Sequence, residues 1–409
     1  MSKKVTKPAI RIDGFGDDWK QSKLGELVQF SKGSGYSKGD LKESGTPIIL
    51  YGRLYTKYET VISDVDTFVD AKVGSIYSHG GEVIVPASGE SAEDISIASV
   101  VEQPGVILGG DLNIITPPAD MDSTFLAISI SNGKPHKDMA RMAQGKSVVH
   151  LHNSDLEKID LNYPCYKEQA LIGSYFKDID NLIVFHKREI DRLECFRKAM
   201  VEKMFPQDGA DVPAVRFGQF KKPWRLCQFS EIFTERHIID TISDEYPQLA
   251  FTIEEGVIRP EDKKTNKRDF LIIDKATKKY LQTEYDDIIY NPANVIFGAI
   301  HRNALGKGCV SPIYKIFYTD QDSTFMECIV RHPRFIKEIS RSMEGTVKKL
   351  RTLKPKAFLE MSAYIAPTIE EQQQIGEYFR QMDRLIEIEK EELEKIKHIK
   401  SACLEKMFV

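Results

Sequence analysis

The sequence predicts an α+β protein with an internal tandem repeat, in which two globular domains are separated by two long antiparallel coiled-coil helices with pseudo-twofold symmetry. Three observations predict this fold. A segment from Pro164 to Phe205 recurs without gaps 203 positions later, from Pro367 to Phe408. The similarity extends into the residues that precede each copy, and those residues carry patterns of short strands. Because a repeat determines the architecture of a whole chain, two copies of one unit are expected here.

Each copy of the repeated segment is predicted to be one long helix. Its apolar residues are spaced alternately by three and four, which is the pattern of a coiled-coil seam. Pro164 and Pro367 stand just ahead of the helices, where a missing N–H costs nothing. Roughly 38 residues at 1.5 Å each give a rod of about 57 Å. One such helix cannot bury its own stripe, so we expect pairing of the helices, or docking of partners, through Ile172, Phe176, Ile179, Ile183, Ile375, Phe379, Met382 and Ile386.

One position of the predicted seam is polar in both helices. His186 stands where Ile or Leu is expected, and Glu389 is its counterpart 203 positions later. Each lies near the middle of its helix, so antiparallel pairing could bring the two together in a polar layer that fixes the register. The alternative, which is the more common arrangement, is that both side chains reach the edge of the seam or face a partner protein.

The parts of the chain ahead of the helices also correspond to one another. Residues 8–11 and Trp19 recur as residues 213–216 and Trp224, and residues 122–125 recur as 322–325. Apolar runs bounded by Gly and Pro predict strands at 81–86, 106–115, 287–290, 294–297 and 313–318. A helix is expected near 123–143 and again near 323–343. The predicted domains are a first globule at 1–162, a central helix at 163–206, a second globule at 207–364 and a C-terminal helix at 365–409.

Composition excludes several classes of protein. No apolar run is long enough to span a bilayer, and the first residues lack the apolar core of a signal peptide. The six cysteines are scattered without a C-x-x-C pair, which is typical of free thiols in a reducing cytoplasm and suggests no metal site. The net charge is −4, but residues 11–155 are acidic by about seven charges and residues 216–358 are basic by about six. We therefore expect a cytoplasmic protein without a bound metal.

Two motifs resemble catalytic sequences but lack the context that the chemistry requires. Residues 140–147 match a loose form of the phosphate-binding loop, yet no strand leads into them and no helical pattern follows. Residues 291–294, Asn-Pro-Ala-Asn, resemble the N-P-P-[YF] motif of adenine methyltransferases, but asparagine cannot replace the aromatic residue that stacks on a flipped base. We interpret residues 291–294 as a turn between strands and expect no catalytic residues.

Over essentially its whole length the chain resembles the specificity subunit of type I restriction–modification systems. The resemblance rests on Trp19 followed by residues 24–27, on the echo of this opening at Trp224, and on two P-x4-Q-x2-I-G-x-Y-F helix entries. Both helices also end in Glu-Lys-Met-Phe. Within the globules, residues 86–91, 109–111 and 310–314 look like the target-recognition domains of this family.

The resemblance implies that each globule is a target-recognition domain that reads one half of a bipartite, asymmetric DNA site. The helices would set the spacer and dock two methylation subunits, which a restriction subunit can join. The chain itself would be non-catalytic and bind no cofactor, since S-adenosylmethionine is expected on the methylation subunits. The complex would be an adenine-specific DNA methyltransferase, and an endonuclease when the restriction subunit is bound.

Candidate DNA contacts follow from residue type and position. Cationic side chains cluster where the predicted helix of each globule ends, and these could neutralise phosphates: Lys134, Lys137, Arg141, Lys146 and His150, then Arg341, Lys348 and Lys349. Candidate base readers carry hydrogen-bonding groups: Ser88, Glu90 and Ser91 in the first globule, and Arg302, Asn303 and Lys307 in the second. The alternative for each is a solvated polar surface. Since the first globule is acidic, either its DNA face is locally basic or the methylation subunits supply much of the phosphate contact.

Two other functions fit the sequence less well than DNA reading. A coiled-coil protein-interaction scaffold without DNA specificity has no need of two divergent, loop-rich globules. A nuclease or methyltransferase in its own right requires a catalytic constellation, and both candidate motifs are incomplete. Sequence-specific DNA binding in host defence is therefore the preferred interpretation.

Overall fold

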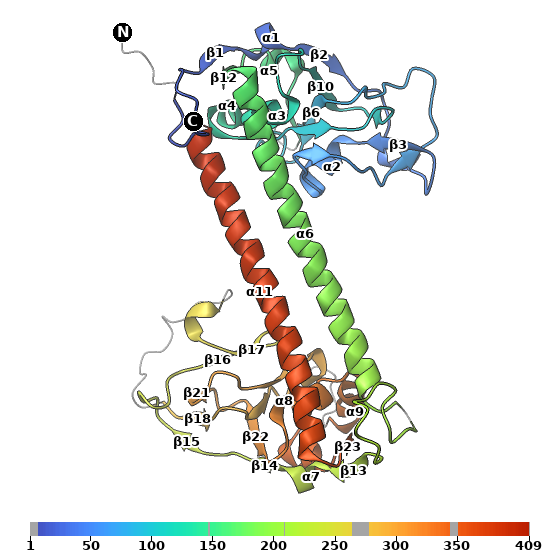
Figure 1. Ribbon diagram of the computed structural model, residues 1–409, viewed down its shortest axis with the longest axis vertical. Helices are drawn as coiled ribbons and strands as arrows, with labels where there is room; N and C mark the ends of the chain where they lie inside the picture. The colour runs from blue at the N-terminus through green and yellow to red at the C-terminus, as the bar shows by residue number, and fades with distance from the viewer. Residues whose placement is uncertain (1–6, 146–147, 208, 264–277, 344–350, 409) are drawn as a thin grey trace. The chain divides into compact units, whose positions relative to one another are not determined.

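The computed structural model describes residues 7–145, 148–207, 209–263, 278–343 and 351–408. The chain divides into two compact units, one of Met1–Arg188 with Lys390–Val409 and one of Glu189–Glu389. We call them unit 1 and unit 2. Each combines one globule with half of each long helix (Figure 1). The predicted four-part division at residues 162, 206 and 364 partitions the chain differently and stays a prediction.

The globule of unit 1 is built on two small sheets. The larger has the strand order β2-β10-β6-β8-β4 and is antiparallel except for the β4–β8 pair, and the smaller has the order β5-β3-β9. Two further pairs are β1 with β12 and β7 with β11. The strands are β1 (Lys20–Lys23), β2 (Gln29–Lys32), β3 (Thr46–Ile49), β4 (Val61–Ile62), β5 (Phe68–Val69), β6 (Glu82–Pro86), β7 (Ser88–Gly89), β8 (Ser99–Val101), β9 (Ile107–Leu108), β10 (Leu112–Thr116), β11 (Val149–His150) and β12 (Asp160–Tyr163). The helices are α1 (Leu24–Leu27), η1 (Lys38–Asp40), α2 (Tyr51–Thr56), α3 (Ser123–Ser131), α4 (Gly133–Met142) and α5 (Asn153–Leu156).

The core of unit 1 forms on both faces of β6. Val83 and Val85 pack into one apolar cluster and Ile84 into another, so alternate residues of this strand serve two faces. Helix α3 covers the first of these faces, and the Asp122 carboxylate caps it by accepting a hydrogen bond from the Phe125 N–H at 2.8 Å. The sheet and α3 therefore form the rigid base from which the loops of this globule extend.

The globule of unit 2 contains related sheets. Its main sheet has the order β14-β22-β19-β20, a second has the order β15-β18-β21, and β13 pairs with β23 and β16 with β17. The strands are β13 (Arg225–Gln228), β14 (Phe233–Glu235), β15 (Ile239–Asp240), β16 (Ala250–Thr252), β17 (Gly256–Ile258), β18 (Tyr280–Thr283), β19 (Ile288–Tyr290), β20 (Ile300–Arg302), β21 (Gly308–Val310), β22 (Lys315–Thr319) and β23 (Ser362–Ile365). The helices are α7 (Phe229–Ile232), η2 (Pro260–Asp262), η4 (Val295–Phe297), α8 (Ser323–Val330), α9 (Pro333–Ser342) and α10 (Pro355–Leu359).

Three predicted elements are wrong in detail. The helix expected at 123–143 is α3 followed by α4, because Asn132 between them is extended at φ −134° and ψ 167°. The helix expected at 323–343 is likewise α8 followed by α9, because His332 precedes Pro333, and a residue before proline disfavours the helical conformation. The strand expected at 294–297 is the single turn η4, which Gly298 ends with a positive φ of 89°.

The two long helices are α6 (Tyr166–Met204) and α11 (Ile369–Met407), each of 39 residues. In unit 1 the first half of α6 lies antiparallel to the last half of α11, where Asp180 pairs with Lys400 (Figure 1). In unit 2 the last half of α6 lies antiparallel to the first half of α11, where Arg197 pairs with Asp383. The predicted seam residues are buried or partly buried: Ile172, Phe176, Ile179, Ile183, Ile375, Phe379, Met382 and Ile386. The predicted fold class is confirmed.

The predicted contact between His186 and Glu389 stays a prediction. The two residues belong to different units, His186 to unit 1 and Glu389 to unit 2. Within unit 1, the hydrogen bond from Lys395 lowers the pKa of the Glu392 carboxyl, and His186 nearby lowers it further.

The glutamine of the repeated helix entry joins each long helix to its globule. In unit 1, Gln169 Oε1 accepts a hydrogen bond from the Asp122 N–H at 3.0 Å, and in unit 2 Gln372 Oε1 accepts the equivalent bond from Asp322 at 3.1 Å. Both glutamines are buried. A buried amide with a specific partner explains why this residue recurs in both copies.

Each unit also contains a buried arginine–glutamate pair at the same place in the repeat. Arg11 makes two hydrogen bonds to Glu168, of 2.6 and 2.7 Å, and Arg216 makes two to Glu371, of 2.6 and 2.8 Å. Both glutamates have no exposed surface. Bidentate pairs of this kind fix geometry, so they hold the segment ahead of each globule against the first turn of α6 or α11.

His301 makes the stability of unit 2 sensitive to acid. Burial, reinforced by the charge of Arg331, lowers the pKa of its ring from 6.5 to about 4. In the unfolded chain the ring titrates near its ordinary pKa, so below about pH 6.5 the unfolded state binds the additional proton. The stabilisation is complete above that pH and is lost as the pH falls towards 4.

We expect the free energy of unfolding to fall by about 2–3 kcal/mol between pH 7 and pH 4.5 on account of this group alone. Urea titrations across this range measure the slope, and His301→Gln should flatten it. An identical slope in the variant would contradict this assignment.

Candidate nucleic-acid interface

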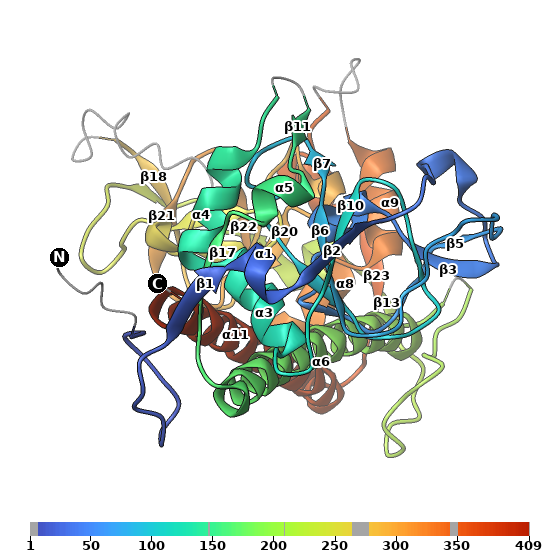
Figure 2. The ribbon, with the colours of Figure 1, turned by 90° about the horizontal axis from the view of Figure 1, so that it is seen from above.

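In unit 1 the candidate readers and cations meet at the loop between β6 and β8, residues 87–98. Strand β7 within this loop pairs with β11, which places Ser88 opposite His150. The Leu151 N–H donates a further hydrogen bond to Ala87 O at 3.0 Å. Figure 2 shows β7 and β11 together on the side of this unit that faces away from α6. Two segments far apart in the sequence thus form one surface.

The three candidate readers of loop 87–98 have different environments. Ser88 is buried and its hydroxyl donates to Asp111 Oδ2 at 3.2 Å, while Ser91 Oγ accepts from the Asp94 N–H at 3.1 Å. These two serines shape the loop. Glu90 is exposed, and a carboxylate there can accept a hydrogen bond from the amino group of a cytosine.

Three of the candidate cations of unit 1 are exposed and a fourth is held within the fold. Lys137 and Arg141 are exposed on α4, and His150 is exposed on β11, although Arg141 also lies 3.4 Å from an Asp138 oxygen. Lys134 Nζ donates to an Asp160 oxygen at 3.0 Å, and this hydrogen bond raises the pKa of the Lys134 ammonium. His150 lies on the strand that pairs with loop 87–98, and α4, which carries Lys137 and Arg141, meets the same loop where His136 Nδ1 lies 2.7 Å from Ser96 O.

In unit 2 the candidate readers are engaged within the fold. Arg302 donates to Asp286 Oδ1 at 2.9 Å, and its guanidinium lies 3.6 Å from a Glu327 oxygen. Asn303 is buried, and its carboxamide bonds the backbone of the turn that follows it. Lys307 pairs with Glu245. These residues organise the connection from β20 to β21, and as base readers they stay predictions.

Three predicted cations, Lys146, Lys348 and Lys349, lie outside the described residues. Arg341 is exposed on α9. Helix α9, which carries Arg341 near its end, packs against η4 in the connection between β19 and β20.

The counterpart of loop 87–98 in unit 2 is that connection, residues 291–299. Strands β6 and β8 pair antiparallel, as do β19 and β20. The hydrogen bond from the Leu353 N–H to Pro292 O, of 3.0 Å, repeats the one from Leu151 to Ala87. Sequence analysis identified residues 291–294 only as a turn, because the two loops differ in length and composition. The two loops are recognised as equivalent because each connects two antiparallel strands, β6 and β8 in unit 1 and β19 and β20 in unit 2.

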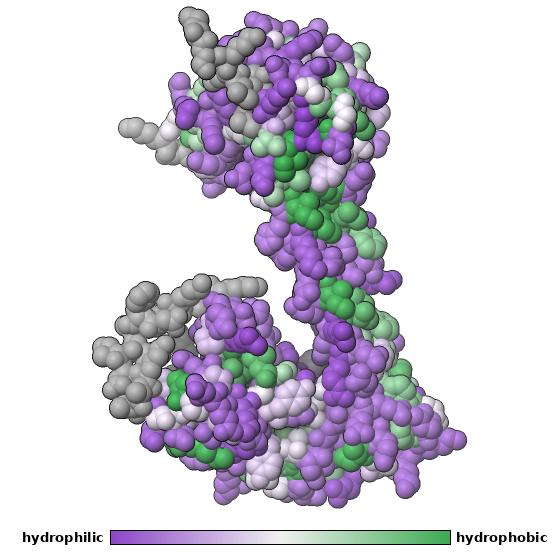
Figure 3. Space-filling model, turned by 60° about the vertical axis from the view of Figure 1, so that its left-hand side comes forward, coloured by the Kyte–Doolittle hydropathy of each residue, from purple (hydrophilic) through white to green (hydrophobic). Residues whose placement is uncertain are grey.

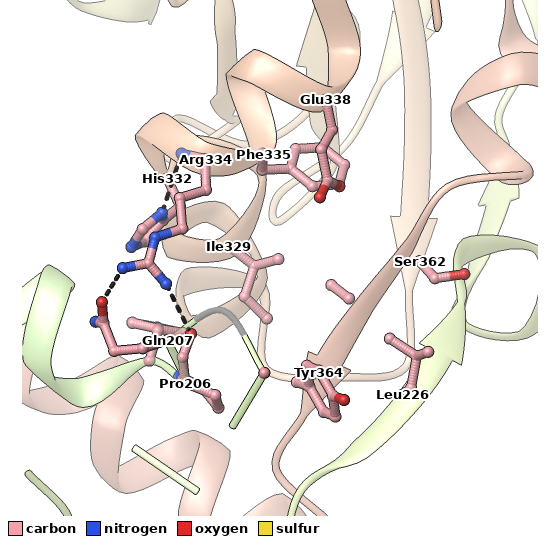
Figure 4. Close-up of a pocket in the computed structure, with 13 residues that line it drawn as sticks. Pro206, Gln207, Leu226, Ile329, His332, Arg334, Phe335, Glu338, Ser362 and Tyr364 are labelled. Carbon is pink, nitrogen blue, oxygen red and sulfur yellow. Dashed lines mark hydrogen bonds between the residues drawn. The ribbon is translucent and has the colours of Figure 1, made fainter. Parts of the chain in front are cut away.

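A pocket of about 260 Å³ lies in unit 2 beside the end of α6 (Figure 4). Leu226 and Phe335 line its apolar part, and Arg334 donates to Pro206 O at 3.3 Å and to the Gln207 side chain. Its lining contains none of the candidate DNA contacts. This pocket is therefore separate from the candidate interface.

The described ranges contain neither a membrane-spanning helix nor a cluster of metal ligands. No helix there is long and apolar enough to cross a membrane. Nor do those ranges contain a group of three or more His, Cys, Asp or Glu side chains placed to hold a metal ion.

Comparison with known proteins shows which proteins the chain resembles. Residues 16–195 match the family model of the type I restriction modification DNA specificity domain. This match covers the globule of unit 1 and most of α6. The chain is also 21% identical over 411 residues to the MjaVIII type I restriction enzyme specificity subunit of Methanocaldococcus jannaschii, a match that covers 95% of this chain and 91% of that protein. The predicted resemblance to specificity subunits is confirmed.

Solved structures of type I systems share the fold. The S subunit from M. genitalium superposes with a TM-score of 0.64 at 15% identity, over 98% of this chain and 99% of that one. A chain from a structural study of complex assembly and conformational transition in a type I system superposes with a TM-score of 0.50 at 14% identity, over 95% of this chain and 97% of that one. The matched domain model and the similar specificity subunit support a role in DNA sequence specificity.

Proposed function

We propose that this specificity subunit reads a bipartite, asymmetric DNA site, with one half read by each unit. The proposal rests on loops 87–98 and 291–299, which hold equivalent places in the two units but carry different side chains. Loop 87–98 contains Glu90, Glu93 and Asp94, whereas loop 291–299 contains two asparagines, an exposed phenylalanine and no acidic residue. Since donors and acceptors on base edges determine which side chains can read them, two such different loops favour two different half-sites.

The long helices would set the spacer between the half-sites. Each contains 39 residues, which corresponds to about 58 Å of helix. One turn of B-DNA measures about 34 Å. Because each helix carries part of both units, it would prevent the two loops from reading adjacent bases. It would also favour one length of DNA between the two half-sites.

The proposed reading has a direct binding test. The complex of this chain with its methylation subunits is titrated with a duplex that carries both halves of the methylated motif, and with duplexes in which the spacer is one or two base pairs longer. We expect a loss of affinity of at least about tenfold for each altered spacer, because one reader then loses its base contacts. Equal affinity for all spacers would count against the proposal.

Matched apolar residues on the helices support docking of two methylation subunits, one on each unit. Leu182, Phe185 and Ile399 are exposed in unit 1, and their repeat counterparts Leu385, Ile388 and Phe196 are exposed in unit 2. Figure 3 shows hydrophobic side chains at the surface of the helices. Exposed apolar residues gathered on an element mark protein-interaction sites. Because the same three repeat positions are apolar in both units, two copies of one partner are favoured. S-adenosylmethionine would bind to those partners, and a restriction subunit could join them.

Substitution of one member of each set should remove one partner. Ile388→Glu places a charge at the proposed contact of unit 2, and we expect it to weaken one of the two binding events about 30-fold or more. Phe185→Glu should do the same in unit 1, and the double variant should bind neither copy. Native mass spectrometry measures the number of methylation subunits bound. Ile313→Glu, at a residue 59% exposed in the globule of unit 2, is the control. Two bound copies in the double variant would exclude this docking surface.

A further inference from the structure

Among the described residues of unit 2, no aromatic side chain is more exposed than Phe297, at 67%. It is the last residue of η4 and lies within loop 291–299. An exposed phenylalanine forgoes the stabilisation that burial would bring, so its position in the proposed reading loop calls for a physical explanation.

The geometry of the turn keeps the Phe297 side chain exposed. Val295, two residues earlier, is fully buried in the main core of unit 2. The Phe297 N–H donates to Asn294 O at 2.9 Å and the Gly298 N–H donates to Val295 O at 3.0 Å, which closes a single helical turn. Gly298 then leaves the turn with a φ of 89°, which suits glycine. Because Val295 anchors the turn and α9 packs against it, Phe297 is presented on a supported element.

The neighbours of Phe297 carry the other groups that a nucleic acid requires. Asn291 Oδ1 accepts hydrogen bonds from the N–H groups of Ala293 and Asn294 and so fixes the start of the turn. The carboxamide of Asn294 forms no hydrogen bond with any residue that the structure describes. Helix α9, which packs against the turn, carries two exposed cations, Lys337 and Arg341, and one exposed acid, Glu338. The loop thus combines a ring, an amide and a cationic border.

We infer that Phe297 is a wedge that stacks on a base in the half-site read by unit 2, and that Asn294 hydrogen-bonds the edge of a base beside it. The inference rests on the proposed function and names the residues that perform it. Apolar side chains insert at base steps, aromatic rings stack on bases of any sequence, and an asparagine amide matches the adenine edge. Residues 87–98 of unit 1 include no aromatic residue, so the wedge belongs to unit 2 alone. DNA is favoured over a protein surface because the ring lies in the loop equivalent to 87–98 and beside cations.

The test uses the complex of the full chain with its methylation subunits. The probes are a duplex with the motif that the wild-type complex methylates, and two duplexes in which one half or the other is scrambled. We expect Phe297→Ala to bind the motif duplex about 10–100-fold more weakly than wild type, whereas Phe297→Trp retains affinity within a few-fold. Scrambling the half read by unit 2 should then lower the affinity of Phe297→Ala by a smaller factor than it lowers the affinity of wild type. Scrambling the other half should lower the affinity of both proteins by the same factor. Ile239→Ala removes an exposed apolar side chain on β15, elsewhere in unit 2, and should change nothing.

Two results would overturn the wedge. One is that Phe297→Ala binds all three duplexes as wild type does, and the other is that it loses methylation subunits, which would make the ring a protein contact. If wild type itself does not distinguish the motif duplex from the scrambled ones, the proposed function fails, and the wedge fails with it. Asn294→Ala should relax the sequence preference at one position while keeping the rest of the motif, and an unchanged motif would remove Asn294 from the reading set.

Discussion

Replacing Glu371 by glutamine should lower the free energy of unfolding by about 3–5 kcal/mol, the range observed when one partner of a buried ion pair is removed. The Glu371 carboxylate has no exposed surface and receives two hydrogen bonds from Arg216 and one from the Trp224 indole N–H, at 3.1 Å. Glutamine keeps the shape but removes the charge, so the Arg216 guanidinium, whose side chain is 9% exposed, remains as a buried cation without its counter-ion. Urea unfolding followed by tryptophan fluorescence measures the loss.

The matched control is Glu370→Gln, one residue away in the same first turn of α11. Glu370 is exposed, so its substitution should alter stability by less than about 0.5 kcal/mol. If Glu371→Gln unfolds at the same urea concentration as wild type, the pair does not hold the start of α11 to the segment ahead of the second globule.

A second large effect is expected from Gly376→Ala. A Cβ at this position would lie 2.1 Å from Asp322 Oδ1, and the same oxygen accepts the hydrogen bond that caps α8. The methyl group must displace either the cap or the helix, so we expect a loss of about 2–4 kcal/mol from overpacking and loss of the cap together. Differential scanning calorimetry would record the lower melting temperature.

Gly218→Ala is the appropriate comparison for this substitution. Its Cβ would meet nothing within 4 Å, and its backbone is not left-handed. Gly173→Ala, where the Cβ would lie 2.5 Å from Asp122 Oδ1, should resemble Gly376→Ala in unit 1. Stability equal to that of Gly218→Ala in both variants would show that the close approach of helix and globule is not required.

The contacts of Gln169, Gly173 and their counterparts show why the helices were predictable. Each motif residue meets a specific neighbour, the aspartate that caps α3 or α8, so the constraint appears twice in the sequence. The apolar residues of α6 and α11, spaced by three and four, likewise predict which side of each helix is buried. Features that depend on local pattern and on repetition are therefore predictable from the sequence.

The reading loops could not be placed in this way. Arg302 and Asn303 have the right chemistry for base recognition, but Asp286 and the turn after Asn303 occupy them, and sequence does not reveal which polar groups are already paired. Phe297 was missed because an apolar residue at the end of a short run resembles a buried strand residue. Its exposure depends on Val295 being the residue that enters the core, which is a tertiary effect.

The most direct test of the account is to map methylated adenines in a host that expresses this chain with its methylation subunit, first intact and then with one globule exchanged for that of another specificity subunit. The account predicts a split motif with modified adenines in both halves, and exchange of residues 7–163 or of residues 213–365 should change only one half each. A continuous motif, or methylation at the same sites without this chain, would show that the two globules do not determine which sequence is read.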